Sequence, residues 1–204
     1  MGGRGGSFNI VRDEGVVSRM FKDEQKGQFI FVDYEHHDTV LRDALEFARE
    51  NGLTDAEARA INMYTATMYM DINRALYGGK PTLEQRSFEN TLNNALGKLS
   101  SYDGTAYRGT NDLTDDDIKR YKDAFKTGRP VIEKGFISTS KDEIKAFTGS
   151  VDFEIRSKKG REITRISKYG DIEDEVLFRS RSKFYVRNVT SKKHGGYRII
   201  LEDI

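Results

Sequence analysis

Apolar residues recur at helical spacing through the first half of the chain. They return every three or four residues, which places them on one face of a helix and predicts a buried stripe. Local signals divide the pattern: Thr54 and Glu57 form a capping box at one helix start, and Asn51-Gly52 and Gly78-Gly79 are stop signals. The stretches predicted as helices are 39–50, 54–77 and 81–99. We therefore expect a helical part over residues 34–104.

The periodicity changes after Gly104. Short runs of β-branched and aromatic residues alternate with turns rich in Gly, Lys or Ser, which is typical of strands. One helix interrupts them, because Thr114 is a good N-cap before an acidic first turn and the helical pattern continues to Phe125. The predicted strands are 105–109, 131–140, 151–155, 161–166, 175–178, 183–189 and 197–202. This pattern favours an α+β fold, with helices first and then two packed, mostly antiparallel β-sheets.

The N-terminal residues show no comparable pattern. Residues 1–7 are rich in glycine, which is typical of a flexible segment, and residues 28–32 suit a short strand or an extended arm. We expect residues 1–33 to be a flexible or extended segment before one domain over 34–204, whose β-rich core covers 105–204. The glycine-rich start suggests fusion to a larger protein.

Composition narrows the classes of function. The 204 residues include 34 Lys and Arg against 33 Asp and Glu, so the formal net charge of +1 makes a nucleic-acid partner an unfavoured reading. The lack of cysteine excludes disulfides, thiolate catalysis and Cys-ligated zinc. Three scattered histidines are too few for a convincing metal site. No apolar run approaches the length of a membrane span, and the N-terminus lacks an apolar signal core, so we expect a soluble chain.

Three polar motifs stand at the ends of predicted strands: Tyr107-Arg108-Gly109, Ser138-Thr139-Ser140 and Glu173-x-Glu175. Each alone has an ordinary explanation, since hydroxyl ladders and acidic strand edges are common. Side chains two residues apart in a strand point to the same face, so we expect Glu173 and Glu175 to project side by side. Two adjacent carboxylates cost free energy unless the protein uses them.

In their order and context these motifs resemble those of the Arg-Ser-Glu class of mono-ADP-ribosyltransferases. That class includes the enzymatic components of actin-modifying binary toxins and related bacterial and phage-borne effectors, and the resemblance covers about residues 64–189. It implies the ADP-ribosyltransferase fold, and an enzyme that cleaves the nicotinamide–ribose bond of NAD⁺ and transfers ADP-ribose to a protein. The implied partners are NAD⁺ as substrate, a protein with an accessible arginine, and a fusion or delivery partner; no metal is implied. The enzyme would be a toxin or effector that is secreted or delivered into a host or competitor cell.

The resemblance assigns roles to residues of the three motifs. Glu175 would stabilise the positive charge that develops on the ribose in an oxocarbenium-like transition state. Arg108 would hold the NAD phosphates, and Gly109 would let the backbone approach the nicotinamide amide closely. Ser138 would donate its hydroxyl to Glu175, and Thr139, also in the cofactor-binding set, would support the sheet around the pocket.

Glu173 is the residue that the resemblance connects with the acceptor. A second carboxylate would orient the guanidinium and take its proton, and in the family Glu at this position goes with arginine as acceptor. Tyr169, in the loop just ahead, resembles the aromatic residue that contacts the protein substrate, although a tyrosine beside a turn could simply pack the loop down. Two other readings stay open: an NAD glycohydrolase, with water as acceptor in the same pocket, and a non-enzymatic binding domain.

Further candidates lie outside the three motifs. Phe147 resembles the aromatic residue that covers the nicotinamide ring; the alternative is an apolar anchor of a short helix over 143–147. A Tyr-x4-Tyr-x3-Asn pattern, which faces the NAD cleft in binary-toxin enzymes, matches Tyr64, Tyr69 and Asn73. The resemblance therefore adds Tyr69 and Asn73 to the cofactor-binding residues, against the alternative of plain core and surface positions.

Overall fold

The structure is a computed structural model that describes the backbone of residues 8–13, 16–23, 28–33 and 39–204 and the side chains of residues 42–204. The chain divides into two compact units. The first comprises Met1–Lys98 and Arg165–Lys168, and the second comprises Leu99–Thr164 and Tyr169–Ile204. The chain passes from the first unit to the second after Lys98, and four residues of the C-terminal half, Arg165–Lys168, belong to the first unit.

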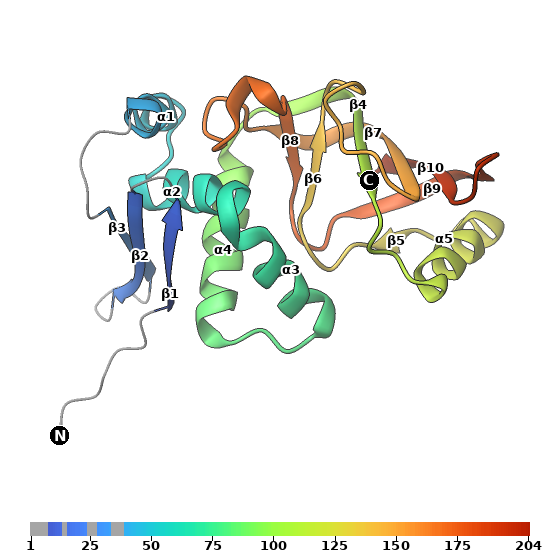
Figure 1. Ribbon diagram of the computed structural model, residues 1–204, viewed down its shortest axis with the longest axis horizontal. Helices are drawn as coiled ribbons and strands as arrows, with labels where there is room; N and C mark the ends of the chain where they lie inside the picture. The colour runs from blue at the N-terminus through green and yellow to red at the C-terminus, as the bar shows by residue number, and fades with distance from the viewer. Residues whose placement is uncertain (1–7, 14–15, 24–27, 34–38) are drawn as a thin grey trace. The chain divides into compact units, whose positions relative to one another are not determined.

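Three strands open the first unit: β1 (Phe8–Asp13), β2 (Val16–Asp23) and β3 (Gln28–Asp33). They form an antiparallel sheet in the order β1-β2-β3 (Figure 1). The sequence predicted a flexible or extended segment here, with a short strand as one of two readings of residues 28–32, where β3 lies, and it did not predict β1 or β2. Antiparallel pairing is made by backbone groups, which every non-proline residue supplies, so a strand without apolar alternation leaves little trace in the sequence. The glycine-rich residues 1–7 lie outside the described residues.

Four helices follow at the predicted positions: α1 (Thr39–Glu50), α2 (Asp55–Met63), α3 (Tyr69–Gly78) and α4 (Leu83–Lys98). The capping box is confirmed, because the Glu57 carboxylate accepts a hydrogen bond from the Thr54 backbone N–H at 2.8 Å and the Thr54 hydroxyl accepts from the Glu57 N–H at 3.2 Å. One continuous helix was predicted over 54–77. The structure instead separates α2 from α3 by a π-helical turn, Tyr64–Met68, a distortion that hydrophobic spacing does not reveal.

The segment Arg165–Lys168 packs within the helical unit. The side-chain amide of Asn62 donates to the Ile166 carbonyl at 3.1 Å, and the Thr65 hydroxyl accepts from the Lys168 N–H at 2.9 Å. The Ile166 side chain is fully buried. These contacts account for the inclusion of a short piece of the C-terminal half in the first unit.

The second unit is built on seven strands and one long helix, α5 (Asp115–Thr127). The strands are β4 (Ser101–Thr110), β5 (Val131–Ile132), β6 (Ile137–Ser140), β7 (Val151–Glu162), β8 (Glu175–Phe178), β9 (Lys183–Ser191) and β10 (Tyr197–Asp203). Their order is β4-β6-β8-β7-β10-β9-β5, and β4 also pairs with β7, so the first four strands close on themselves (Figure 1). Within the described residues only β7 and β10 pair in parallel. The predicted α+β class with mostly antiparallel strands is confirmed.

Several predicted strands have different limits in the structure. Strand β4 begins at Ser101, within the part expected to be helical, and the strands expected over 151–155 and 161–166 form the single strand β7. The strand expected over 131–140 is divided into β5 and β6 around Glu133, a buried carboxylate that accepts from the Tyr121 hydroxyl at 2.8 Å and pairs with Arg120 at 3.0 Å. The strand expected over 161–166 ends at Glu162, as the last part of β7, because the chain then turns into the helical unit.

The core of the second unit lies between the strands and α5. It contains residues of every strand, and α5 contributes Ile118, Tyr121 and Ala124. Phe178 at the end of β8 is fully buried and meets Phe184 edge to face, with ring centres 5.4 Å apart. This packing anchors the strand that begins at Glu175. No helix in the described part of the chain is both long and apolar enough to span a membrane.

Replacing Phe178 with alanine should lower the free energy of unfolding by about 3–5 kcal/mol, because it removes a large buried ring and leaves a cavity. Urea denaturation followed by circular dichroism measures the change. Phe125→Ala is the matched control, since that ring on α5 is 46% exposed, and its loss should cost within about 0.5 kcal/mol. A loss below about 1 kcal/mol for Phe178→Ala would contradict its place in the core.

Candidate active site

Three paired strands of the second unit bring the sequence motifs together. Arg108 and Gly109 lie near the end of β4, Ser138 lies in β6, and Glu175 begins β8. Strand β6 pairs with both neighbours, through Tyr107 opposite Ser140 on one side and Ser140 opposite Glu175 on the other. The sheet therefore gathers segments that are far apart in the sequence.

Ser138 connects the other two motif residues. Its hydroxyl donates a hydrogen bond to Oε1 of Glu175, and its backbone carbonyl accepts from Nη1 of Arg108 at 2.9 Å. Glu175 is only 2% exposed. A buried carboxylate requires hydrogen-bond partners, and Ser138 supplies one from the adjacent strand. The hydrogen bond that the sequence predicted between Ser138 and Glu175 is present, while the roles of the three residues remain predictions.

Thr139 points its hydroxyl into the sheet. This buried hydroxyl donates to the Val176 carbonyl at 2.6 Å and so fastens β6 to β8. The supporting role expected for Thr139 agrees with this position. Its place among the cofactor-binding residues does not, because the side chain is buried and its donor is used by the backbone.

Strand β8 begins at Glu175, as the sequence predicted, but the residues just before it are not extended. A 3-10 turn covers Gly170–Ile172, Glu173 ends it with φ −104° and ψ −15°, and Asp174 has a left-handed φ of 46°. The strand begins only at Glu175. The expectation that strand alternation directs Glu173 and Glu175 to one face is therefore wrong. A helical turn and a left-handed residue set the direction of Glu173 instead.

The environment of Glu173 favours a proton acceptor. Burial raises the pKa of the Glu173 carboxyl above its ordinary value of 4.5, because desolvation penalises the charged form. A carboxylate with a raised pKa binds a proton more strongly, which suits a general base. The turn thus presents a half-buried carboxylate that can take a proton.

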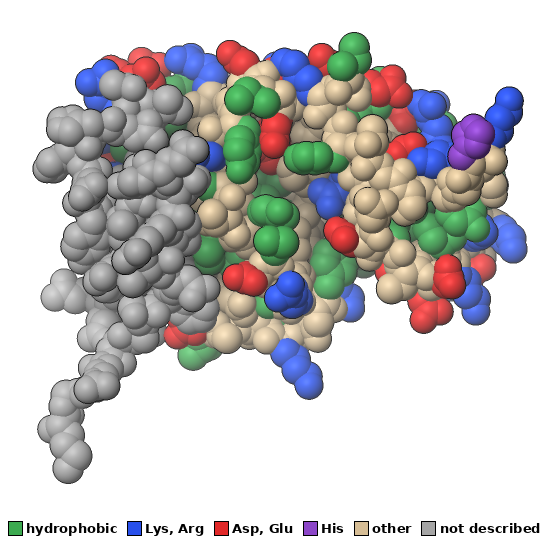
Figure 2. Space-filling view, in the orientation of Figure 1, with side chains coloured by type: hydrophobic (Ala, Val, Ile, Leu, Met, Phe, Trp, Pro, Cys, Tyr) green, Lys and Arg blue, Asp and Glu red, His purple; other side chains and the backbone are tan. Residues whose placement is uncertain are grey.

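Exposed apolar side chains lie in this turn, just before it and on the loop after β6. Ile144 is 93% exposed and Ile172 is 75% exposed, and Tyr169 just before the 3-10 turn is 40% exposed. Apolar side chains reach the surface among charged ones on the face drawn in Figure 2. Contact of Tyr169 with a protein substrate and packing of the loop by Tyr169 both stay predictions.

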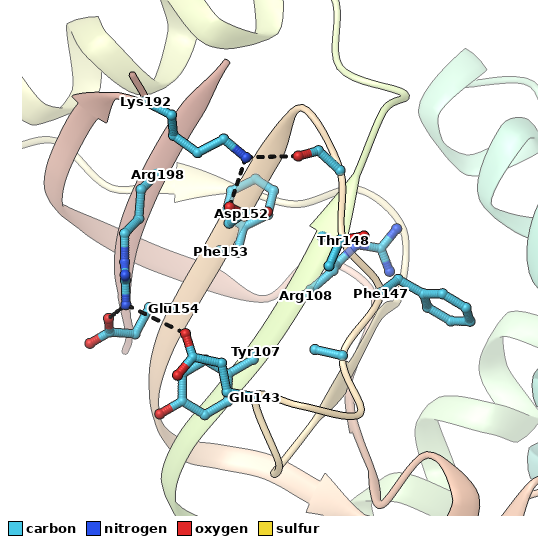
Figure 3. Close-up of a pocket in the computed structure, with 13 residues that line it drawn as sticks. Tyr107, Arg108, Glu143, Phe147, Thr148, Asp152, Phe153, Glu154, Lys192 and Arg198 are labelled. Atoms are coloured by element: carbon cyan, nitrogen blue, oxygen red, sulfur yellow. Dashed lines mark hydrogen bonds and ion pairs between the residues drawn. The ribbon is translucent and has the colours of Figure 1, made fainter. Parts of the chain in front are cut away.

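A pocket of about 350 Å³ lies beside Arg108 (Figure 3). It is lined by Arg108, Gly109 and Phe147 of the predicted NAD-binding set, and Ser138, Glu173 and Glu175 are not among its lining residues. Two ion pairs form part of its wall: Lys192 with Asp152 at 2.8 Å, and Arg198 with Glu154 at 2.8 Å. The pocket and the hydrogen-bonded motif residues therefore meet at Arg108.

The ion pairs in this wall were not predicted from the sequence. Their members lie on β7, on β10 and in the residues that follow β9, and no motif connects them. Arg198 stands opposite Asp152 in the parallel pairing of β10 with β7, and its guanidinium bonds the next residue on that face, Glu154. Alternation of acidic and apolar residues in β7 was the only available signal, and it indicates a polar face without naming a partner.

Gly109 is required by the protein's own backbone. A Cβ atom built at this position would lie 2.0 Å from the carbonyl oxygen of Phe147, so the loop after β6 can rest on β4 only if residue 109 has no side chain. The close approach to nicotinamide remains a prediction. The Phe147 ring is 73% exposed and, in Figure 3, points away from Lys192 and Asp152. The alternative that Phe147 anchors a short helix is wrong, since no helix covers residues 143–147 and the ring is not buried.

The remaining candidates belong to the helical unit. Tyr64 is buried, and its hydroxyl accepts a hydrogen bond from the Asn73 side-chain amide at 3.0 Å. Tyr69 is 43% exposed at the start of α3. Tyr64 and Asn73 thus form part of the packing of this unit, and NAD contact by Tyr69 and Asn73 remains a prediction from the resemblance.

Comparison with known proteins places the chain among ADP-ribosyltransferases. The family model described as ADP-ribosyltransferase exoenzyme matches residues 42–204. The Mycobacterium avium (strain 104) protein Mav, which carries the name of a NAD(+)–arginine ADP-ribosyltransferase, is 36% identical over 152 residues, which are 72% of this chain and 18% of that protein. The NAD(+)–protein-arginine ADP-ribosyltransferase Tre1 of Pseudomonas putida (strain GB-1) is 36% identical over 137 residues, 66% of this chain and 26% of Tre1.

A solved structure agrees with this placement. Exoenzyme S from Pseudomonas aeruginosa, in complex with human 14-3-3 protein beta and bound to carba-NAD, aligns with a TM-score of 0.63 at 25% identity over 79% of this chain and 82% of that one. The chain spans 18% and 26% of the length of the two curated relatives. The family model, the relatives and the fold agree, and the chain belongs to the ADP-ribosyltransferase exoenzyme family.

Proposed function

We propose that this chain is an arginine-specific NAD:protein mono-ADP-ribosyltransferase. The observation that carries the proposal is the hydrogen-bonded series from Arg108 through Ser138 to the buried Glu175, with Glu173 in the adjoining turn. The names of Mav and Tre1 support arginine as the acceptor. The two curated relatives are much longer than this chain, so the target and the delivery of a whole protein are also parts of the proposal.

Glu175 acts on the ribose. As the bond between the ribose C1 and the nicotinamide nitrogen breaks, its electron pair leaves with nicotinamide and positive charge develops on the sugar. A carboxylate that is held in place before the reaction stabilises this charge without reorganising. Ser138 keeps Glu175 in that orientation through its hydroxyl.

Arg108 acts on the phosphates of NAD. Its guanidinium is planar and presents several donors in a fixed fork, which suits phosphate oxygens. The hydrogen bond to the Ser138 carbonyl fixes one edge of the guanidinium next to the pocket. One residue of β6 thus positions both the group for the phosphates and the group for the ribose.

Glu173 acts on the acceptor. An arginine side chain is protonated at neutral pH and must lose a proton before its nitrogen can form a bond to C1 of the ribose. Glu173 receives that proton, and its raised pKa matches the task. The products are ADP-ribosyl-arginine and neutral nicotinamide. No step of this scheme calls for a metal ion.

The protein substrate is expected to contact the loops beside Glu173. Ile144, Ile172 and Tyr169 are exposed there, so a target protein would meet apolar groups around the carboxylate that receives its arginine. We further propose that the chain is the enzymatic part of a toxin or effector that acts in a host or competitor cell, with a fusion or delivery partner. NAD glycohydrolysis, with water at the position of the acceptor, is the second candidate, because both reactions would use Arg108, Ser138 and Glu175.

The change Glu173→Gln separates the two activities. We expect transfer to a guanidine acceptor such as agmatine to fall at least about 100-fold, because the general base is lost, while NAD hydrolysis stays within about threefold. Chromatography of nicotinamide and of the modified acceptor measures both. Glu175→Gln is the matched control and should lose both activities. Transfer that survives in Glu173→Gln would show that the acceptor role is misassigned.

The residue that is modified in a natural substrate tests the acceptor class directly. Cell lysate incubated with NAD and the enzyme, then analysed by mass spectrometry, should contain ADP-ribose on arginine. Modified Asn, Gln or Thr would overturn the arginine assignment. Release of nicotinamide without any labelled protein would instead favour the glycohydrolase.

The two reactions should also differ in their dependence on pH. Glu173 must be ionised to accept a proton and burial raises its pKa, so kcat/KM for the guanidine acceptor should decline, as the pH falls, at a higher pH than an ordinary glutamate would give. Hydrolysis of NAD without an acceptor should lack this step. The pH dependence of both reactions, measured under the same conditions, tests this. If both rates decline at the same low pH, Glu173 is not the base.

The change Gly109→Ala should weaken NAD binding about tenfold, because the added methyl group forces the loop at Phe147 away from β4 and from the pocket beside Arg108. Calorimetric titration with carba-NAD measures the affinity. Gly78→Ala serves as the control, since a Cβ there has no neighbour within 4 Å. Equal affinities in the two variants would show that the loop does not need its present position for NAD binding.

A further inference from the structure

The turn that holds Glu173 is tied to the loop after β6 by a lysine. The ammonium group of Lys145 donates to the Asp174 carboxylate at 2.6 Å and also to the backbone carbonyl of Asp171 at 2.6 Å. Asp171 and Asp174 lie on either side of Glu173 in the sequence. One side chain therefore connects both ends of the short segment that carries the acceptor carboxylate.

A second lysine, Lys141, which directly follows β6, also holds Asp174. Its backbone carbonyl accepts from the Lys141 N–H at 2.9 Å, and the Lys141 ammonium lies 3.6 Å from its carboxylate while bonding Glu162 at 2.6 Å. The Asp174 side chain is only 18% exposed, and that of Lys145 is 34% exposed. Ion pairs with partial shielding and good geometry contribute more than fully exposed pairs.

The carboxyl group of Asp174 is ionised at neutral pH. Its hydrogen bond with Lys145 holds the pKa of Asp174 below its ordinary value. A depressed carboxyl pKa means that the ion pair is intact at neutral pH and is lost only as the pH falls through that depressed value. The Asp174 carboxylate is therefore ionised at neutral pH, as the ion pair requires.

The other catalytic carboxylate is held by separate contacts. Glu175 receives the Ser138 hydroxyl, its carbonyl accepts from the Ile163 N–H at 3.0 Å, and β8 pairs with β6 and β7. Neither Lys145 nor the Asp174 carboxylate takes part in these contacts. The contacts that hold Glu175 in β8 thus differ from those that Lys145 makes with the turn of Glu173.

We propose that Lys145 and Asp174 are positioning residues for the acceptor step: their ion pair holds Glu173 where it meets the arginine, and so sets the ratio of ADP-ribose transfer to NAD hydrolysis. This inference rests on the proposed function. It assigns no contact with NAD to either residue. Loss of the pair should loosen Glu173, which lowers transfer, and leave Glu175 in place, which preserves cleavage of NAD.

The test uses variants on both sides of the pair. Asp174→Asn keeps the size of the side chain and its tolerance of the left-handed backbone but removes the charge. Lys145→Met keeps the length of the side chain without its ammonium group. Each should lower the ratio of transfer to agmatine over NAD hydrolysis about tenfold, with hydrolysis within about twofold of the wild type. Lys145→Arg, which can still bond a carboxylate, should recover most of the ratio.

A double-mutant cycle excludes unrelated effects. Because both changes remove the same interaction, Lys145→Met with Asp174→Asn should lower the ratio no further than either change alone. A change at Lys145 also alters the loop that carries Phe147, two residues further on. Asp174→Asn removes the same ion pair without changing any residue of that loop. Arg187→Met is the matched control: it removes a 2.8 Å pair with Glu202 between β9 and β10 and should leave the ratio unchanged.

The outcomes distinguish failure of this inference from failure of the proposed function. Wild-type enzyme that hydrolyses NAD but modifies no guanidine would refute the proposed function, and the inference with it. If the wild type transfers ADP-ribose, then unchanged ratios in Lys145→Met and Asp174→Asn would overturn the inference alone. Parallel losses of transfer and hydrolysis, with a lowered Tm, would also overturn it, because they would indicate general destabilisation.

Discussion

The hydrogen bond between the Ser138 hydroxyl and the buried carboxylate of Glu175 is the contact on which the rest of the site depends. Burying a carboxylate costs several kcal/mol unless its hydrogen bonds are made, so the fold must bring a donor to it from another strand. Strand β6 does this because it lies between β4 and β8, and the pairing of β4 with β7 closes the four strands around it. The same serine binds Arg108 through its carbonyl, so a shift of β6 would move both groups that are proposed to act on NAD.

The acceptor side of the site obeys a different constraint. Glu173 lies outside the sheet, in a turn whose geometry depends on Gly170 and Asp174 with positive φ and on the ion pair with Lys145. Glu175, by contrast, lies in a strand whose neighbours on both sides are fixed by hydrogen bonds. On the proposed roles, the carboxylate for the ribose lies in a paired strand and the carboxylate for the acceptor lies in a turn. We therefore expect a substitution in the turn to affect transfer more than hydrolysis.

Local signals in the sequence predicted much of this structure. The capping box at Thr54 and Glu57 and the three aspartates after Thr114 involve residues within one turn of each other, so their meaning does not depend on the fold. The strand runs predicted β4, β8 and β10 for the same reason. The hydrogen bond from Ser138 to Glu175 joins distant residues, and only the resemblance to a family with known strand order made it predictable. Contacts without such a precedent were missed, such as the pairing of Arg198 with Glu154 and that of Lys145 with Asp174.

The missed contact between Lys145 and Asp174 matters because Asp174 has a left-handed backbone conformation. A non-glycine residue in this region costs about 1–2 kcal/mol relative to glycine, so glycine would suit the backbone of the turn better. Aspartate tolerates the conformation and brings a carboxylate, which meets the ammonium group of Lys145 and lies near that of Lys141. Aspartate at this position therefore costs some backbone strain, but it supplies the carboxylate that binds the turn to the neighbouring loop. A glycine would relieve the strain and at the same time release the segment that holds Glu173, and this is the physical reason to regard the aspartate as part of the site.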